Sequence, residues 1–129
     1  MQDVTNKYTG RALAYIGDCV FELCVRRHLV NEGIAHSAKL NKEALGFVTA
    51  TKQAAYMEGI REMLTEEEAL VCRRGKNMTH NNIPKSASKE EYSHATELEV
   101  LFGYLYLSER QDRIDELFSR IVELHSIDT

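Results

Sequence analysis

The strongest indication of the fold lies in residues 13–26, which read LAYIGDCVFELCVR. In this stretch, and on to about Asn31, apolar side chains occur on every side of a helix instead of along one stripe. A helix that is apolar all round is buried in the centre of a protein, and Gly33 is a suitable residue to end it. We therefore expect a central, buried helix from about Arg11 to Asn31.

The rest of the chain also favours helices, because it contains one proline and few alternations of apolar and polar residues. Capping boxes, in which a serine or threonine precedes a glutamate or glutamine by three residues, predict helix starts at Thr65, Ser88 and Ser108. The further helices that we expect span residues 37–45, 47–64, 66–74, 88–107 and from 108 toward the C-terminus. The predicted fold class is all-α.

At 129 residues and 14.7 kDa the chain has the length of one domain, which we expect to span residues 1–129. The formal net charge of −4 should on average repel other polyanions, so composition alone makes nucleic acid an unexpected partner. Three cysteines without paired spacing indicate neither a disulfide framework nor a metal cage. No signal segment opens the chain, and no apolar stretch approaches the roughly 20 residues that span a bilayer. We therefore expect a soluble, cytoplasmic protein.

The basic residues are concentrated in one window of the chain. Between Ala69 and Lys89 there are five basic residues and no acidic one, which leaves a net charge of −9 for the rest of a chain whose total is −4. Residues 74–88 contain almost nothing apolar and predict a long polar loop, and such loops are often functional. A solvated loop fits the residues alone equally well, but clustered basic and amide groups also bind RNA phosphates and 2′-hydroxyls. The candidate RNA-binding residues are Arg73, Arg74, Lys76, Asn77 and Lys85.

Two carboxylates stand in strongly apolar surroundings. Asp18 interrupts the first helix and Glu99 lies within the predicted helix 88–107, and a glycine, Gly17 or Gly103, lies near each of them where helix backbones can approach closely. Burying an unpaired ionised carboxylate is costly, so each of them needs compensation. A backbone amide or an arginine would supply it, and from the residues alone this structural role is the commoner explanation. A hard cation such as Mg²⁺ would supply it as well, because it prefers carboxylate oxygens.

Weaker candidates are polar side chains close to Asp18 or Glu99 in the sequence. They are Glu22, His94, Thr96 and Glu97. Glu22 lies one turn after Asp18, where it either supports the carboxylates or pairs with Arg26. Glu97 lies two residues from Glu99 on another side of the helix, so we expect it in solvent. His94 and Thr96 are candidates for contact with a substrate, and the histidines show no metal-ligand spacing.

Residues 13–26 resemble the signature helix of the Mini-ribonuclease III family. The resemblance continues in order through nearly the whole chain, in Val48-Thr49-Ala50, Gln53-Ala54, Arg74-Gly75-Lys76-Asn77, Tyr92, Ala95-Thr96, Leu98-Glu99 and residues 101–107. This family is the compact bacterial branch of the ribonuclease III class, a homodimeric, all-helical endonuclease domain without a separate domain for binding double-stranded RNA. The resemblance implies an Mg²⁺-dependent endoribonuclease that cleaves double-stranded RNA to 5′-phosphate and 3′-hydroxyl ends. It implies precursor 23S ribosomal RNA as the substrate.

By position, the resemblance assigns the catalytic and metal-binding roles to Asp18 and Glu99. Glu22 and Thr96, which lie near them in the sequence, are candidates to support these carboxylates. The larger ribonuclease III enzymes carry further carboxylates four and seven residues before the aspartate and three before the glutamate. Here these positions hold Ala14, Arg11 and Thr96. The departures resemble those of the compact branch, but they keep an alternative open. That alternative is a catalytically silent protein on the same fold that binds RNA or assists ribosome assembly.

Overall fold

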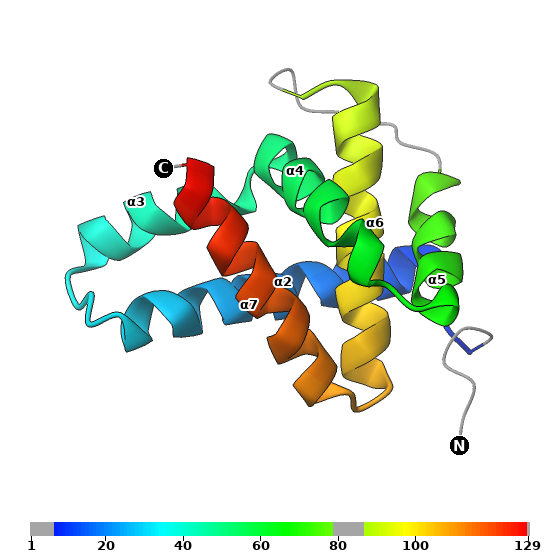
Figure 1. Ribbon diagram of the computed structural model, residues 1–129, viewed down its shortest axis with the longest axis horizontal. Helices are drawn as coiled ribbons and strands as arrows, with labels where there is room; N and C mark the ends of the chain where they lie inside the picture. The colour runs from blue at the N-terminus through cyan, green and yellow to red at the C-terminus, as the bar shows by residue number, and fades with distance from the viewer. Residues whose placement is uncertain (1–6, 79–86, 129) are drawn as a thin grey trace.

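A computed structural model of the protein describes residues 7–78 and 87–128, and every regular element in these ranges is helical (Figure 1). The helices are α2 (Gly10–Asn31), α3 (Ser37–Val48), α4 (Ala50–Ile60), α5 (Glu66–Lys76), α6 (Lys89–Leu107) and α7 (Gln111–Asp128), with a 3₁₀ turn, η1 (Arg61–Met63), after α4. The predicted all-α class is therefore confirmed. Within the described ranges, no helix combines the length and the apolar character needed to cross a membrane.

Helices α2 and α6 cross at the centre of the molecule and make its most extensive contact between helices. Helices α4 and α5 flank α6, and α7 passes over α2 (Figure 1). The aromatic ring of Phe21 on α2 lies edge-on to two others. The distance between ring centres is 5.5 Å to Phe102 of α6 and 5.9 Å to Phe118 of α7. Burial of such rings is a main source of stability. The expectation that the first helix is central is confirmed, but burial on every side is not, because Tyr15, Leu23 and Val30 of α2 are exposed.

Local signals in the sequence locate several helix ends correctly. Thr65 and Ser88 each form a complete capping box at the start of α5 and α6. Gly33 follows α2 with φ +88°, a backbone conformation that favours glycine. The predicted start at Ser108 is wrong, because Ser108 caps the C-terminus of α6 and the chain turns through Glu109, with φ 59°, before α7 begins at Gln111.

The break predicted between the helices at 37–45 and 47–64 is placed too early in the sequence. The backbone of Thr49 is extended, and its hydroxyl accepts a hydrogen bond from the Lys52 amide, so that α3 ends at Val48 and a new helix, α4, follows. Helix α4 then ends at Ile60 and gives way to η1. A threonine inside an apolar stripe can serve as a cap, and the apolar periodicity alone does not reveal it.

The start of α5 is tied to α7 by a buried ion pair. The Glu68 carboxylate is only 2% exposed and accepts two hydrogen bonds from Arg113. Burial alone would raise the pKa of Glu68, but the hydrogen bonds from Arg113 and from the Thr65 amide outweigh burial and lower it. The same guanidinium donates to the Met63 carbonyl oxygen at 2.6 Å. These contacts fix the orientation of α5, and with it the position of its C-terminal turn.

Candidate active site

The crossing of α2 and α6 is so close that it needs glycine on both helices. A Cβ atom on Gly17 would lie 1.6 Å from the carbonyl oxygen of Glu99, and one on Gly103 would lie 2.0 Å from the carbonyl oxygen of Leu13. Real side chains do not approach backbone atoms so closely, so no other residue fits at either position without moving a helix. The crossing therefore brings together the residues that adjoin these two glycines.

Asp18 and Glu99 are the carboxylates that this crossing brings together. Asp18 is exposed, Glu99 is half-buried, and their carboxyl groups share a hydrogen bond. Burial of Glu99, the charge of Asp18 and this hydrogen bond raise the pKa of Glu99 from 4.5 to about 8. Two ionised carboxylates within hydrogen-bonding distance repel each other, so without a cation the pair holds a proton at neutral pH.

The chemistry of this pair fits a hard divalent cation. Carboxylate oxygens are the ligands that such a cation prefers, and Asp18 and Glu99 would hold it while its charge would compensate theirs. In residues 7–78 and 87–128 there is no group of three or more His, Cys, Asp and Glu side chains that could hold a metal ion. A cation at this pair would complete its coordination with water or phosphate oxygens, which is the usual behaviour of Mg²⁺.

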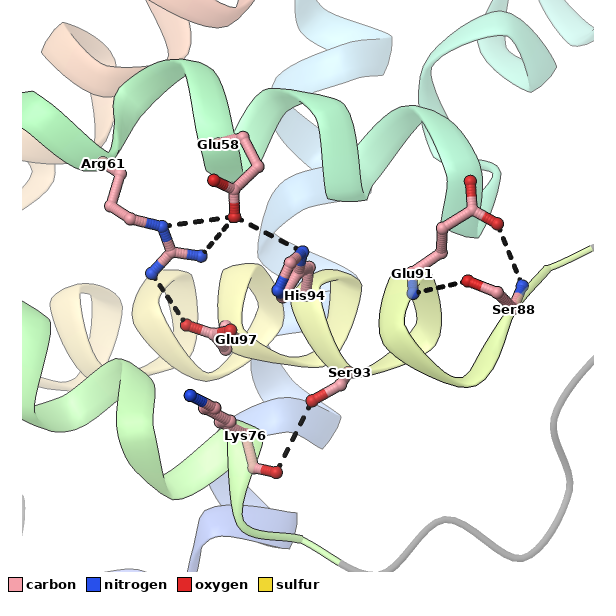
Figure 2. Close-up of polar contacts among 8 residues, drawn as sticks. All are labelled: Glu58, Arg61, Lys76, Ser88, Glu91, Ser93, His94 and Glu97. Carbon is pink, nitrogen blue, oxygen red and sulfur yellow. Dashed lines mark hydrogen bonds and ion pairs between the residues drawn. The ribbon is translucent and has the colours of Figure 1, made fainter.

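On another side of α6, a cluster of charged side chains fixes this helix against the end of α4 (Figure 2). The carboxylate of Glu97 is 2% exposed and accepts a hydrogen bond from Arg61 at 3.1 Å. Arg61 also donates to Glu58 at 2.7 Å, and the His94 ring nitrogen lies 3.3 Å from the same Glu58 carboxylate. The expectation that Glu97 lies in solvent is wrong. Its partner is 36 residues away in the sequence, where no local pattern reveals it.

The candidate RNA-binding residues gather at the end of α5. Arg73, Arg74 and Lys76 belong to its last turn and Asn77 caps it, so the polar loop predicted over residues 74–88 begins later than expected. Lys85 lies outside the described residues. Gly75, in the same turn, packs directly against α6, because a Cβ atom there would lie 2.9 Å from the Cα atom of Glu97. The basic turn thus contacts the helix that carries Glu99.

Within this turn, the arginines differ in their surroundings. Arg73, Lys76 and Asn77 are exposed, whereas Arg74 is half-buried. The guanidinium of Arg74 donates to the carbonyl oxygen of Tyr8 at 2.6 Å, so it also holds the chain that leads into α2. The sequence does not predict this contact, because the two residues are 66 positions apart.

The two residues expected to support the carboxylates make other contacts. Glu22 pairs with Arg26 at 2.8 Å, which is one of the two arrangements that the sequence left open. Thr96 is 5% exposed, and its hydroxyl donates to the carbonyl oxygen of Tyr92, one turn earlier in α6, at 2.8 Å. A supporting role for Glu22 and Thr96 stays a prediction.

Comparison with known proteins matches residues 11–110 to the Ribonuclease III domain family. The chain is 42% identical over 105 residues, 81% of each chain, to a Symbiobacterium thermophilum protein named Mini-ribonuclease 3. It is 34% identical over 120 residues to a Streptococcus pneumoniae protein of the same name, which covers 92% of this chain and 94% of the other. Its fold is similar to the crystal structure of a Fusobacterium nucleatum protein, with a TM-score of 0.85, 29% identity, and coverage of 95% of this chain and 98% of that one.

Proposed function

Because the chain belongs to the ribonuclease III domain family, in its Mini-ribonuclease 3 branch, and is therefore an endoribonuclease, we propose that it matures precursor 23S ribosomal RNA. In this proposal the enzyme acts in the cytoplasm as a homodimer, cleaves double-stranded RNA with Mg²⁺, and leaves 5′-phosphate and 3′-hydroxyl ends. The observation that carries the proposal is the pairing of Asp18 with Glu99 across the crossing of α2 and α6.

Asp18 and Glu99 are the residues that would hold the metal ion. A divalent cation bound here supplies a water of lowered pKa and positive charge against the reacting phosphate. A carboxylate must be ionised to act as a ligand, so Glu99 would have to lose its proton to hold a cation. Because Asp18 is exposed, the pair remains open to a substrate as large as an RNA duplex.

The basic end of α5 supports RNA as the substrate. Arg73, Lys76 and Asn77 are exposed on a turn that packs against α6, and no acidic residue occurs in the sequence between Ala69 and Lys89. Such a surface attracts the phosphate backbone and reads the shape of a duplex more than its bases. In the proposal, Lys85 extends this surface.

One exposed face of α2 supports a homodimer. Tyr15, Leu23 and Val30 are 86%, 63% and 58% exposed, and the side chain of Cys19 is exposed between the first two. Their spacing places them along one side of the helix. A row of large apolar side chains in water is unfavourable and is typical of a surface that a partner covers. A second copy related by a twofold axis would cover the same row on both chains and place two sites on one duplex.

One observation favours the second candidate, a catalytically silent protein that binds RNA or assists ribosome assembly. Only two carboxylates meet at the crossing, and no larger group of metal-ligating side chains occurs in the part of the chain that the structure describes. Both candidates bind RNA, so only a cleavage assay separates them. Wild-type protein that binds duplex RNA but leaves it intact in Mg²⁺ would favour the silent protein.

The decisive experiment substitutes Asp18→Asn and measures the initial rate of cleavage of a precursor 23S stem in Mg²⁺. The substitution removes one charged ligand and keeps the size of the side chain, so we expect the rate to fall by more than about 100-fold. Helix content and affinity for the RNA without metal should stay close to those of the wild type.

The matched control is Asp112→Asn, the same chemical change at an exposed position at the start of α7. It should leave the rate within about twofold of the wild type, since surface substitutions away from a site have small effects. Full activity of the Asp18→Asn variant would remove Asp18 from the site. Cleavage of mature and precursor RNA at equal rates would contradict the proposed substrate.

A further inference from the structure

The first turn of α2 and the segment that leads into it carry two cations that lie outside the basic window of residues 69–89. Lys7 and Arg11 are both exposed, and no acidic residue occurs between Lys7 and Gly17. The Lys7 Nζ atom lies 5.4 Å from the centre of the Tyr8 ring. An ammonium group is attracted to an aromatic face at this distance, so Tyr8 helps to position the Lys7 charge.

Contacts with α5 hold this segment beside the basic turn. Arg74 donates to the Tyr8 carbonyl oxygen at 2.6 Å. A Cβ atom on Gly10 would lie 3.4 Å from the sulfur of Met78 and 3.6 Å from the Arg74 carbonyl oxygen, so the start of α2 is in contact with the end of α5. Lys7 and Arg11 therefore extend the positive surface that Arg73, Arg74 and Lys76 form.

The position of Arg11 relative to the carboxylates is set by the geometry of the helix. Arg11 precedes Asp18 by seven residues, which is two turns of α2, so both side chains leave the same side of the helix. The rise along the axis is roughly 10 Å. A nucleic-acid strand whose reacting phosphate lies at Asp18 and Glu99 would therefore place a neighbouring phosphate within reach of the long Arg11 side chain.

We propose that Lys7 and Arg11 form a second phosphate-binding surface, continuous with the last turn of α5, which holds the RNA backbone beside the phosphate to be cut. This inference rests on the proposed function and adds a subsite to it. Because phosphates look alike at every nucleotide, these contacts position the duplex and carry no base specificity. The subsite acts on substrate binding and leaves the chemical step to the carboxylates.

The test is the double variant Lys7→Gln/Arg11→Gln. We measure its affinity for two RNA duplexes of different sequence, without divalent metal, over a range of salt concentrations. Each lost phosphate contact should lower the slope of log affinity against log salt by about 1, so the slope should fall by about 2. At about 0.15 M salt the affinity should drop at least fivefold, and by the same factor for both duplexes. In cleavage assays KM should rise while kcat stays within about twofold.

The matched control is Lys39→Gln/Lys42→Gln, which removes the same charge from exposed positions on α3, at the other end of α2 from α5 (Figure 1). It should leave the salt slope nearly unchanged. The single variant Arg11→Lys keeps both positive charges, so its RNA affinity should be close to that of the wild type. Equal melting temperatures of the variants show that the fold is intact.

Three results would overturn the inference in different ways. If the wild type binds and cleaves duplex RNA but Lys7→Gln/Arg11→Gln has the affinity and salt slope of the control, then only the second surface is wrong. If the wild type neither binds nor cleaves duplex RNA, then the proposed function fails, and the second surface fails with it. A loss of affinity for one duplex sequence but not for the other would contradict phosphate binding.

Discussion

The carboxyl group of Glu99 is half-buried and hydrogen-bonded to Asp18, and these surroundings raise its pKa from 4.5 to about 8. The folded protein therefore favours the protonated form of Glu99 more than the unfolded chain does. Below pH 4.5 both states hold the proton, and this contribution to stability is fully present. It is lost as the pH rises through about 8, because folding then requires an ionised Glu99 beside the charge of Asp18.

The first prediction follows from this environment. In a metal chelator, the wild type should lose stability relative to Glu99→Gln as the pH rises from about 5 to about 8. One unit of pKa difference corresponds to about 1.4 kcal/mol. We therefore expect the difference in unfolding free energy between the wild type and Glu99→Gln to change by at least ~1 kcal/mol. Thermal melts of both proteins at each pH measure it. Millimolar Mg²⁺ should reduce the loss for the wild type only, because a cation that binds the folded state stabilises it.

A difference between wild type and Glu99→Gln that stays constant with pH would contradict the raised pKa. Glu116→Gln is a suitable control, because the Glu116 side chain is 60% exposed. The stability of this variant relative to the wild type should vary little over the same pH window.

At the scale of the elements, the crossing of α2 and α6 decides whether a site exists. At Gly17 and Gly103 the backbone of one helix fills the space that a side chain of the other helix would need. Helices with side chains at the contact stay about 8–10 Å apart. Such a separation would move Asp18 away from Glu99 and break the hydrogen bond that they share. Small residues at the crossing are therefore a condition for the pair.

The second prediction tests this crossing with Gly17→Ala. The new Cβ atom would lie 1.6 Å from the Glu99 carbonyl oxygen, so the helices must separate. We expect a loss of about 3 kcal/mol or more in the free energy of unfolding, measured with urea, because backbone atoms cannot move aside as a flexible side chain does.

Gly46→Ala on α3 is the matched control, since its Cβ atom would meet only the His125 ring, at 3.4 Å. Alanine is favoured over glycine inside a helix by about 1 kcal/mol, so this variant should be as stable as the wild type or slightly more stable. Equal stabilities of Gly17→Ala and the wild type would show that the helices have room at the crossing.

At the scale of the whole molecule, the single chain leaves the apolar face of α2 exposed. The large side chains on it, Tyr15 and Leu23, lie on the helix that also supplies Asp18. A partner that covers this face would therefore set the distance between the two copies of the site. In the proposed dimer, α2 would thus supply one carboxylate of each site and also set the spacing of the two sites.

The third prediction concerns this face. Leu23→Lys places a charge in the centre of the proposed interface, so sedimentation velocity at micromolar concentration should show a monomer where the wild type is a dimer. Leu70→Lys is the control, because Leu70 is 58% exposed, close to the 63% of Leu23, but lies on α5. It should remain a dimer. A monomeric wild type, or a dimer that tolerates Leu23→Lys, would contradict the assignment of this face.

Some features of the molecule follow from neighbouring residues alone. The capping boxes at Thr65 and Ser88 and the stop at Gly33 are made within a few residues, so the sequence predicts them correctly. The sequence predicts the break between α3 and α4 near Gly46 and not at Thr49, because apolar side chains continue on both sides of Thr49. It does not predict the burial of Glu97, because the arginine that pairs with this carboxylate, Arg61, is distant in the sequence.

The sequence by itself determined the all-helical class, the central position of the first helix and the identity of the two unusual carboxylates. These depend on periodicity, on caps and on a family signature, which are properties of short segments. Only the tertiary structure decided that Asp18 and Glu99 are hydrogen-bonded to each other, and that Lys7 and Arg11 adjoin the basic turn of α5. Both arrangements join segments more than 60 residues apart, and their distances are set by how closely helices can pack, which no local pattern specifies.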